Sequence, residues 1–285
     1  MPPVFSPFGF IQVGDFVVPV TIPVWSVGGA TSCGRSGQGG AGELNSGLIF
    51  GGIAASSTNS TEEYDGSSWS GGGNLINARY AMGSAGTQNA ALSFGGTPSA
   101  GTEEYDGGSW STGGGMITPR NNPGGAGTQN AALGFGGGAN TSCTEEYNGA
   151  SWATGGALIN TRANMQGQGV GTQNAALAIS GYRSPTWITC TEEYDGVSWS
   201  AGGAVIRSRS AASTGINGTQ NTGLMFGGFC GNNISCTERY DGTSWSSGCA
   251  MITARRGIGG AGNQSAALAG AGFSTANVTC TEEYS

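Results

Sequence analysis

The chain of 285 residues contains no histidine and no lysine, and only 9 % of its residues are charged. Without histidine there is no Ser-His-Asp triad, no Cys-His pair and no imidazole ligand for a metal. Without lysine there is neither a Schiff-base nucleophile nor the lysine of a phosphate-binding loop. Any enzymatic chemistry would therefore have to use carboxylates, cysteine or tyrosine.

Positive charge is also scarce. The ten cationic residues are all arginine, they form no run, and the formal net charge is −7. Proteins that bind phosphate backbones or anionic lipid surfaces carry clustered Lys and Arg, so we expect no nucleic-acid partner and no membrane insertion. Segment 1–24 is apolar, but it lacks a cationic start and is interrupted by Pro7, Pro19 and Pro23. We expect it to be neither a signal peptide nor a membrane span.

Glycine, by contrast, makes up 57 of the 285 residues, and the sequence is strongly repetitive. The string TEEY, once TERY, occurs six times at intervals of 41 to 47 residues. A Trp recurs in the same phase, and an Arg follows each Trp by ten positions. The Trp residues are Trp25, Trp69, Trp110, Trp152, Trp199 and Trp245. The Arg residues are Arg35, Arg79, Arg120, Arg162, Arg209 and Arg255.

Each unit contains four short runs of strand length, separated by Gly, Asn and Asp-Gly turns, and none shows an apolar stripe of helical period. A repeat of this length with four strands corresponds to one blade of a β-propeller. We therefore predict an all-β fold, a six-bladed β-propeller with four antiparallel strands in every blade.

The two ends of the repeat array predict how the ring closes. The first unit begins at Trp25, in the position of a fourth strand, and the last unit reaches Tyr284 at the end of its third strand. We expect the strand around Trp25 to complete the blade formed by about residues 255–284. Residues 25–285 would then be the propeller and residues 1–24 a separate arm.

The units resemble the kelch repeat. Its pattern is a double Gly after the second strand, a Glu two residues before a Tyr, a Trp, a long apolar residue six after the Trp and an Arg ten after it. The double Gly occurs at 51–52, 95–96, 136–137 and 227–228, whereas Ser180-Gly181 and the Gly-Ala-Gly at 270–272 depart from it. The apolar position holds Leu75, Met116, Leu158, Val205 and Met251, with Thr31 in the first unit.

This resemblance covers residues 25–284 and implies a kelch-like propeller. The nearly verbatim strings GTQNAAL, TEEYDG and SWS also resemble Gly-rich kelch-like proteins of bacteriophages, particularly aquatic ones. That second resemblance implies a component of a virion.

The repeated Tyr and Trp lie on neighbouring strands and are expected to pack between blades. The first Glu of each TEE or TER string shares a strand face with the Tyr, because side chains alternate along a strand. We expect this Glu to form a partly buried, bidentate ion pair with a phased Arg. The six carboxylates are Glu62, Glu103, Glu145, Glu192, Glu238 and Glu282.

Few charged residues are left to form an active site. Outside the repeated strings and the Asp-Gly turns, the acids are Asp15 and Glu43. A glycosidase needs two carboxylates with different pKa values, whereas a Glu repeated in every unit favours a scaffold role. The oxidases among kelch-like enzymes use copper with His ligands, which this chain lacks. We expect no enzymatic activity, no cofactor and no metal site, and keep a carbohydrate-active enzyme as an alternative.

The seven cysteines do not have the spacing of a zinc site. Cys143, Cys190, Cys236 and Cys280 directly precede the TEE or TER strings, and we interpret them as small buried apolar residues. Cys230 and Cys236 flank one loop, and the sequence leaves open whether they form a disulfide. The odd number of cysteines favours synthesis in a reducing host cytoplasm.

The loop after the double Gly differs in every unit, whereas the turns GTQN and YDGxSW hardly change. In a four-stranded meander these loops share one face with the connections between blades, so we expect that face to bind a ligand. Tyr182, Arg183 and Trp187 lie in the longest loop, and Phe229 and Phe273 in the next two. Exposed aromatic rings beside an Arg suit binding to sugars or proteins. Alternatively, Tyr182 and Trp187 cover only their own loop.

The N-terminal arm is too apolar for a solvated tail. We expect it to dock onto another virion protein, by adding a strand to it, or else to pack back over its own propeller. The residues proposed for docking are Phe5, Phe8, Phe10, Ile11, Phe16 and Val18.

These observations together favour a non-enzymatic phage protein located in the virion, in several copies per particle. The preferred role is a receptor-binding tail or fibre component that presents its loops to a host glycan or surface protein. The alternative is a head or tail decoration protein that binds only its own particle.

Overall fold

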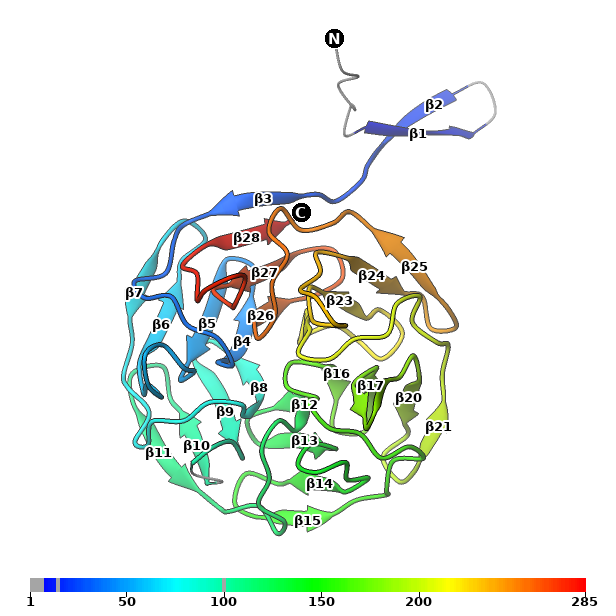
Figure 1. Cartoon of the computed structure of the whole chain (residues 1–285). Helices are drawn as coiled ribbons and strands as arrows, with labels where there is room; N and C mark the ends of the chain where they lie inside the picture. Colours follow the sequence, from blue (N-terminus) through cyan, green and yellow to red (C-terminus); the bar gives the residue numbers. More distant parts are fainter. Residues whose placement is uncertain (1–7, 14–15, 99–100) are drawn as a thin grey trace.

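A computed structural model describes residues 8–13, 16–98 and 101–285, and describes side chains from residue 22 onward. Within those ranges all regular secondary structure is β-strand, and no helix is formed. Six four-stranded antiparallel sheets are arranged as the blades of a closed ring (Figure 1). The six-bladed β-propeller expected from the repeats is confirmed.

We number the blades along the chain. Blade 1 contains β4 (Gly39–Glu43), β5 (Ser46–Phe50), β6 (Thr61–Tyr64) and β7 (Trp69–Gly71). Blade 2 contains β8 (Gly83–Thr87), β9 (Ala90–Phe94), β10 (Thr102–Tyr105) and β11 (Trp110–Gly113). Blade 3 contains β12 (Gly124–Thr128), β13 (Ala131–Phe135), β14 (Thr144–Tyr147) and β15 (Trp152–Thr154).

Blade 4 contains β16 (Gly169–Thr172), β17 (Ala175–Ile179), β20 (Thr191–Tyr194) and β21 (Trp199–Ala201). Blade 5 contains β22 (Ser213–Thr214), β23 (Leu224–Phe226), β24 (Thr237–Tyr240) and β25 (Trp245–Gly248). Blade 6 contains β26 (Gly259–Gly262), β27 (Ala267–Gly270), β28 (Thr281–Tyr284) and β3 (Trp25–Gly28).

Two hairpins lie outside the blade sheets. β1 (Phe8–Val13) pairs with β2 (Phe16–Thr21) beyond the rim of the ring, next to the start of β3 (Figure 1). β18 (Tyr182–Arg183) pairs with β19 (Thr186–Trp187) in the long loop of blade 4. The second hairpin gives the variable loop of blade 4 a defined shape.

The two ends of the repeat array close the ring. β3 is the outer strand of blade 6 and pairs antiparallel with β28, with Trp25 opposite Tyr284 and Gly28 opposite Thr281. The backbone N–H of Val24 also donates to the Ser285 carbonyl at 3.0 Å. The predicted closure by the strand around Trp25 is therefore confirmed.

Repeated aromatic residues join neighbouring blades. In every blade the Tyr that ends the third strand faces the Trp that starts the fourth, with ring centroids 4.9 to 5.1 Å apart. The indole N–H of Trp110 then reaches back to blade 1 and donates to Thr61 Oγ1 at 3.0 Å. The other five Trp residues make the equivalent bond at 2.9 to 3.0 Å. Each Trp thus fixes its own blade against the preceding one.

The backbone explains the two departures from the double Gly. The first residue of the pair has φ between +51° and +66°, whether it is Gly51 or, in blades 4 and 6, Ser180 or Ala271. An L-residue can adopt this left-handed conformation at a modest cost. The second residue has φ between +90° and +116° in all six blades, a region open essentially to Gly alone. Substitution is therefore found at the first position.

Inner strands from neighbouring blades pass so closely that glycine is needed there. A Cβ on Gly40 would lie 2.4 Å from the carbonyl oxygen of Gly260, in the adjacent blade. The axis itself is filled, because Gln166 Nε2 donates to the carbonyl of Gln38, on the opposite blade, at 2.8 Å. The cavity beside this bond measures about 10 Å³, which is at the lower limit for one water molecule.

The meander topology gives the ring two different faces. The short-turn face carries the connections between first and second strands and between third and fourth strands. The long-loop face carries the connections between second and third strands and those from one blade to the next. The loops after the double Gly, which differ in every repeat, therefore lie on the long-loop face. The short-turn face carries one exceptional connection, residues 215–223 between β22 and β23 of blade 5, which is longer than the corresponding turns of the other blades.

Candidate functional site

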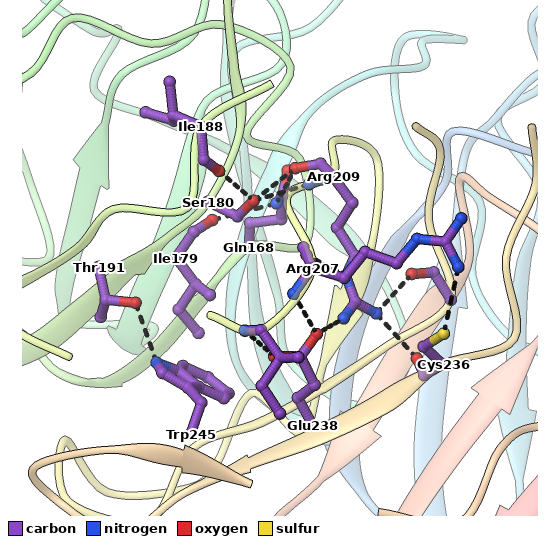
Figure 2. Close-up of polar contacts among 12 residues, drawn as sticks. Gln168, Ile179, Ser180, Ile188, Thr191, Arg207, Arg209, Cys236, Glu238 and Trp245 are labelled. Carbon is purple, nitrogen blue, oxygen red and sulfur yellow. Dashed lines mark hydrogen bonds and ion pairs between the residues drawn. The ribbon is translucent and has the colours of Figure 1, made fainter. Parts of the chain in front are cut away.

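The first Glu of every TEE or TER string is buried in an ion pair. The predicted partners are confirmed for all six, as the pairs Arg35–Glu62, Arg79–Glu103, Arg120–Glu145, Arg162–Glu192, Arg209–Glu238 and Arg255–Glu282. Figure 2 shows the pair formed by Arg209 and Glu238 in blade 5. Burial lowers the pKa of Arg209 to about 10, so this side chain is cationic at neutral pH.

The expected bidentate, partly buried geometry is wrong. The arginine side chains are at most 3 % exposed, and each contacts Glu Oε1 through a single nitrogen. The other terminal nitrogen donates to backbone carbonyls; in Arg209 these are the carbonyls of Gly227 and Cys236. The second carboxylate oxygen accepts a backbone N–H, that of Ile206 at 2.7 Å in the case of Glu238. Both oxygens are thus occupied, which suits a scaffold role.

The second Glu of the string joins neighbouring blades. Tyr105 Oη donates to Glu63 Oε1 at 2.5 Å and accepts the Gly73 N–H at 3.3 Å. Burial, aided by this carboxylate, raises the pKa of Tyr105 to about 12. The same shift to about 12 occurs at Tyr64, Tyr147, Tyr194 and Tyr240. These carboxylates, too, stabilise the ring.

Charge is segregated between the two faces. The connections on the long-loop face contain nine of the ten Arg residues and no Asp or Glu. Six of these nine are neutralised by buried Glu, which leaves Arg183, Arg207 and Arg256 without a carboxylate partner among the described residues. The Asp residues of the Asp-Gly turns and Glu43 lie on the opposite, short-turn face. The acidic chain therefore has one cationic face.

Four of the five residues proposed for binding form a continuous band on the long-loop face. Tyr182 and Trp187 are opposite each other in the β18–β19 hairpin, with ring centroids 5.7 Å apart. The Trp187 ring lies 5.9 Å from Phe229 of blade 5, and its indole N–H donates to Ser210 Oγ at 3.1 Å. Trp187 therefore contacts the next blade and does not cover only its own loop.

Arg256 extends this band to Phe273. Its guanidinium carbon lies 4.5 Å from the centre of the Phe229 ring and 4.9 Å from that of Phe273. We call Tyr182, Trp187, Phe229, Arg256 and Phe273 the aromatic band. All five side chains are half-buried, so part of each surface faces solvent.

Two hollows border the band. A hollow of about 230 Å³ at the mouth of the axis has Gln166 among its lining residues, together with Tyr80 and Asn122. A second hollow of about 410 Å³ lies over blades 5 and 6 and is lined by Phe229, Asn232, Asn233, Ser274 and Thr275 among others. Arg256 and Phe273 line both hollows, so the cation lies on the wall that they share.

Sequence reasoning selected Arg183 and missed Arg256. Arg183 follows Tyr182 directly, so the two side chains leave β18 on opposite sides. The Arg183 side chain is exposed, and its Nη1 donates to Asn160 Oδ1 at 3.2 Å. Arg256 follows the repeated Arg255, and its place between two rings comes from loops of different blades. No local signal in the sequence marked it.

The remaining predicted groups are placed as follows. All seven cysteines are free thiols, so Cys230 and Cys236 form no disulfide. The four expected to be buried, Cys143, Cys190, Cys236 and Cys280, are half-buried, as are Cys230 and Cys249, and Cys33 is exposed. Cys236 Sγ lies 3.7 Å from Arg207 Nη1 (Figure 2). The proposed docking residues Phe5, Phe8, Phe10, Ile11, Phe16 and Val18 fall outside the residues whose side chains are described.

Membrane-spanning helices and metal sites were two further possibilities for the part of the chain that is described. It contains no helix with the length and apolar character needed to cross a bilayer. It contains no group of three His, Cys, Asp or Glu side chains placed to hold a metal ion. No protein-family model matches this chain, and no curated protein matches it closely enough to be identified as a relative.

Proposed function

We propose that this chain is a non-enzymatic, kelch-like binding protein of a bacteriophage particle, which presents its long-loop face to a glycan or protein on the host surface. The aromatic band carries the proposal. Half-exposed aromatic rings next to an unpaired cation have the composition of binding surfaces, and the band lies where the otherwise repetitive chain departs from its repeats. The phage assignment rests on the resemblance of the repeat strings.

The arrangement of the carboxylates supports a binding role over a catalytic one. A retaining or inverting glycosidase needs one carboxyl group able to donate a proton and a second one facing the substrate. Here the first Glu of each repeat has both oxygens occupied, and the second Glu accepts a hydrogen bond from a Tyr in five of the six interblade contacts. These contacts indicate that the Glu residues stabilise the ring, and they leave no free pair of carboxylates for catalysis among the described residues of the repeats.

The binding role can be tested with the purified chain on an array of bacterial surface glycans and on intact host cells. We expect the labelled chain to bind, and Trp187→Ala to abolish binding while the fold is retained. Val197→Ala is the matched control, because Val197 is an exposed apolar residue in a short turn. If neither cells nor glycans bind, and phage adsorption is unchanged by Trp187→Ala, the chain is a decoration protein.

Attachment to the particle is a separate part of the proposal. The β1–β2 hairpin lies outside the ring (Figure 1), where it is available to pair with another chain. Deletion of residues 1–22 leaves β3 and the closed ring intact and is expected to abolish incorporation into particles. Normal incorporation of the shortened chain would contradict docking through this segment.

A further inference from the structure

The guanidinium of Arg256 is held in place but is not neutralised. It stacks between Phe229 and Phe273 at 4.5 and 4.9 Å. Among the described residues its single hydrogen-bond acceptor is Asn233 Oδ1, 3.4 Å from Nη1. A guanidinium has five N–H donors, so most of its donors are available to a ligand. Its positive charge has no carboxylate counter-ion among the residues that the structure describes.

Asn233 makes the arrangement rigid. Its Nδ2 donates to the backbone carbonyls of Phe273 at 3.2 Å and Ser274 at 2.6 Å. The amide thereby links the loop of blade 5 to the loop of blade 6, with Arg256 between the two loops. A cation fixed before a ligand arrives loses less conformational entropy on binding than a free side chain would.

The surroundings of Arg256 select for an anion. Neither hollow is lined by an Asp or a Glu, and the described acids lie in buried pairs, on strands between blades or on the short-turn face. An anionic ligand approaching the long-loop face therefore meets no carboxylate at the band. The ion pair it forms with Arg256 would be partly desolvated by the two rings, which strengthens it.

The other lining groups indicate which kind of anion fits. The hollow of about 410 Å³ is lined by two amides, Asn232 and Asn233, two hydroxyls, Ser274 and Thr275, and two phenyl rings, around one cation. Neutral amides and hydroxyls match the hydroxyl groups of a sugar, and the rings offer apolar faces to its C–H groups. A single planar guanidinium matches one carboxylate.

We propose that Arg256, held between Phe229 and Phe273, binds the carboxylate of an acidic sugar, a hexuronic or nonulosonic acid within a longer saccharide. The sugar ring lies in the hollow over blades 5 and 6, with Asn232, Asn233 and Thr275 facing its hydroxyls. This inference rests on the proposed binding function and names the class of ligand at the same site.

Calorimetric titration of the full chain tests the assignment. The probes are trigalacturonic acid, a hyaluronan tetrasaccharide and sialyllactose, each compared with its methyl ester, which removes the charge and keeps the ring. We expect at least one acid to bind about tenfold or more tightly than its ester. If every acid binds no better than its ester, the assignment is overturned. It is also overturned if a sulfated saccharide or an acidic peptide binds through Arg256 and none of these acids does.

Substitutions locate the site. Arg256→Gln is expected to weaken binding of the acid about tenfold and leave binding of the ester unchanged. Arg256→Lys keeps the charge without the planar fork and should give an intermediate affinity. Arg207→Gln is the matched control, because Arg207 is also an exposed Arg of this face without a carboxylate partner, and it should change affinity by less than about twofold. Equal losses in Arg207→Gln and Arg256→Gln would contradict a specific site.

The two proposals fail in different ways. If the chain binds host cells through Trp187 but binds no acidic saccharide through Arg256, the binding function stands and the ligand class is wrong. If acidic saccharides bind through Arg256 but no loop substitution affects attachment to cells or phage adsorption, the site exists and the receptor-binding role is wrong.

Discussion

The indole of Trp25 packs against the phenol ring of Tyr284 with ring centroids 5.1 Å apart, although the two residues lie near opposite ends of the chain. The same indole contacts Phe226 of blade 5 at 4.9 Å and donates to Thr237 Oγ1 at 3.0 Å. β3 and β28 come from the two ends of the chain, so blade 6 is closed by non-covalent contacts alone. Loss of this contact would open blade 6 and with it the ring.

Trp25→Ala is expected to destabilise the chain by about 3–5 kcal/mol, because it removes a large buried side chain and leaves a cavity at the closing blade. Chemical denaturation followed by tryptophan fluorescence measures the loss. Trp187→Ala is the control, since Trp187 is half-buried in a loop hairpin and should cost much less. If the two variants lose equal stability, the closing contact has no special role.

The fold could be predicted from the sequence because the same residues recur in the same phase. The positions of Trp25 and Tyr284 within the repeat were sufficient to place β3 beside β28. Strand alternation also identified which Glu pairs with the phased Arg. It did not predict the single-nitrogen contact, since the N–H that occupies Oε2 of Glu238 comes from the backbone of Ile206, which no side-chain pattern reveals.

The site could be predicted only in part, for a related reason. Four aromatic residues could be selected from the sequence because they stand in loops that otherwise differ between repeats. Tyr182 pairs with Trp187 across a hairpin, and Phe229 and Phe273 occupy equivalent places in two later loops. Arg256 becomes part of the site through stacking between blades 5 and 6. Such contacts depend on how two loops meet in space, and the repeat pattern carries no information about them.

Each buried Glu of the ion pairs is expected to act as scaffold. Glu238→Gln leaves the buried Arg209 without a counter-charge, and losing one partner of a buried pair costs about 3–5 kcal/mol. The melting temperature should fall clearly. Glu43→Gln is the control, because Glu43 is exposed on the short-turn face, where Asn217 Nδ2 donates to it at 3.0 Å. Unchanged stability of Glu238→Gln would reopen a catalytic role for this carboxylate.

The contact between blades 5 and 6 lacks the Tyr–Glu hydrogen bond that the other five make, and one substitution should supply it. Arg239 stands where the other repeats have a second Glu, so the buried hydroxyl of Tyr284 lies beside a guanidinium and has no carboxylate acceptor for its proton. A guanidinium has no acceptor for the phenol proton. Arg239→Glu is expected to stabilise the chain by about 1 kcal/mol.

The reverse change provides the matched comparison. Glu193→Arg removes the acceptor of Tyr240, which now donates to Glu193 Oε1 at 2.5 Å, and should destabilise the chain by about 1–3 kcal/mol. Both variants can be measured by denaturant titration. Changes of the same sign in the two variants would contradict this account of the Tyr284 contact.

Alkaline pH should open the ring by ionising the tyrosines between blades. In the folded chain burial and the neighbouring Glu carboxylates raise the pKa of Tyr64, Tyr105, Tyr147, Tyr194 and Tyr240 from 10.0 to about 12. The unfolded chain therefore releases these protons at lower pH than the folded chain does. Their contribution to stability is complete below pH 10 and is lost as the pH rises towards 12.

A titration followed by tyrosinate absorbance and by circular dichroism checks this behaviour. We expect the folded chain to resist ionisation of these five rings up to about pH 12, and then to ionise and unfold together. The chain in denaturant should ionise near pH 10. Glu104→Gln, which replaces the charged acceptor of Tyr147 by a neutral one, should lower the pKa of that ring. Ionisation of the five rings near pH 10 without unfolding would contradict the view that burial and the hydrogen bonds to Glu raise their pKa.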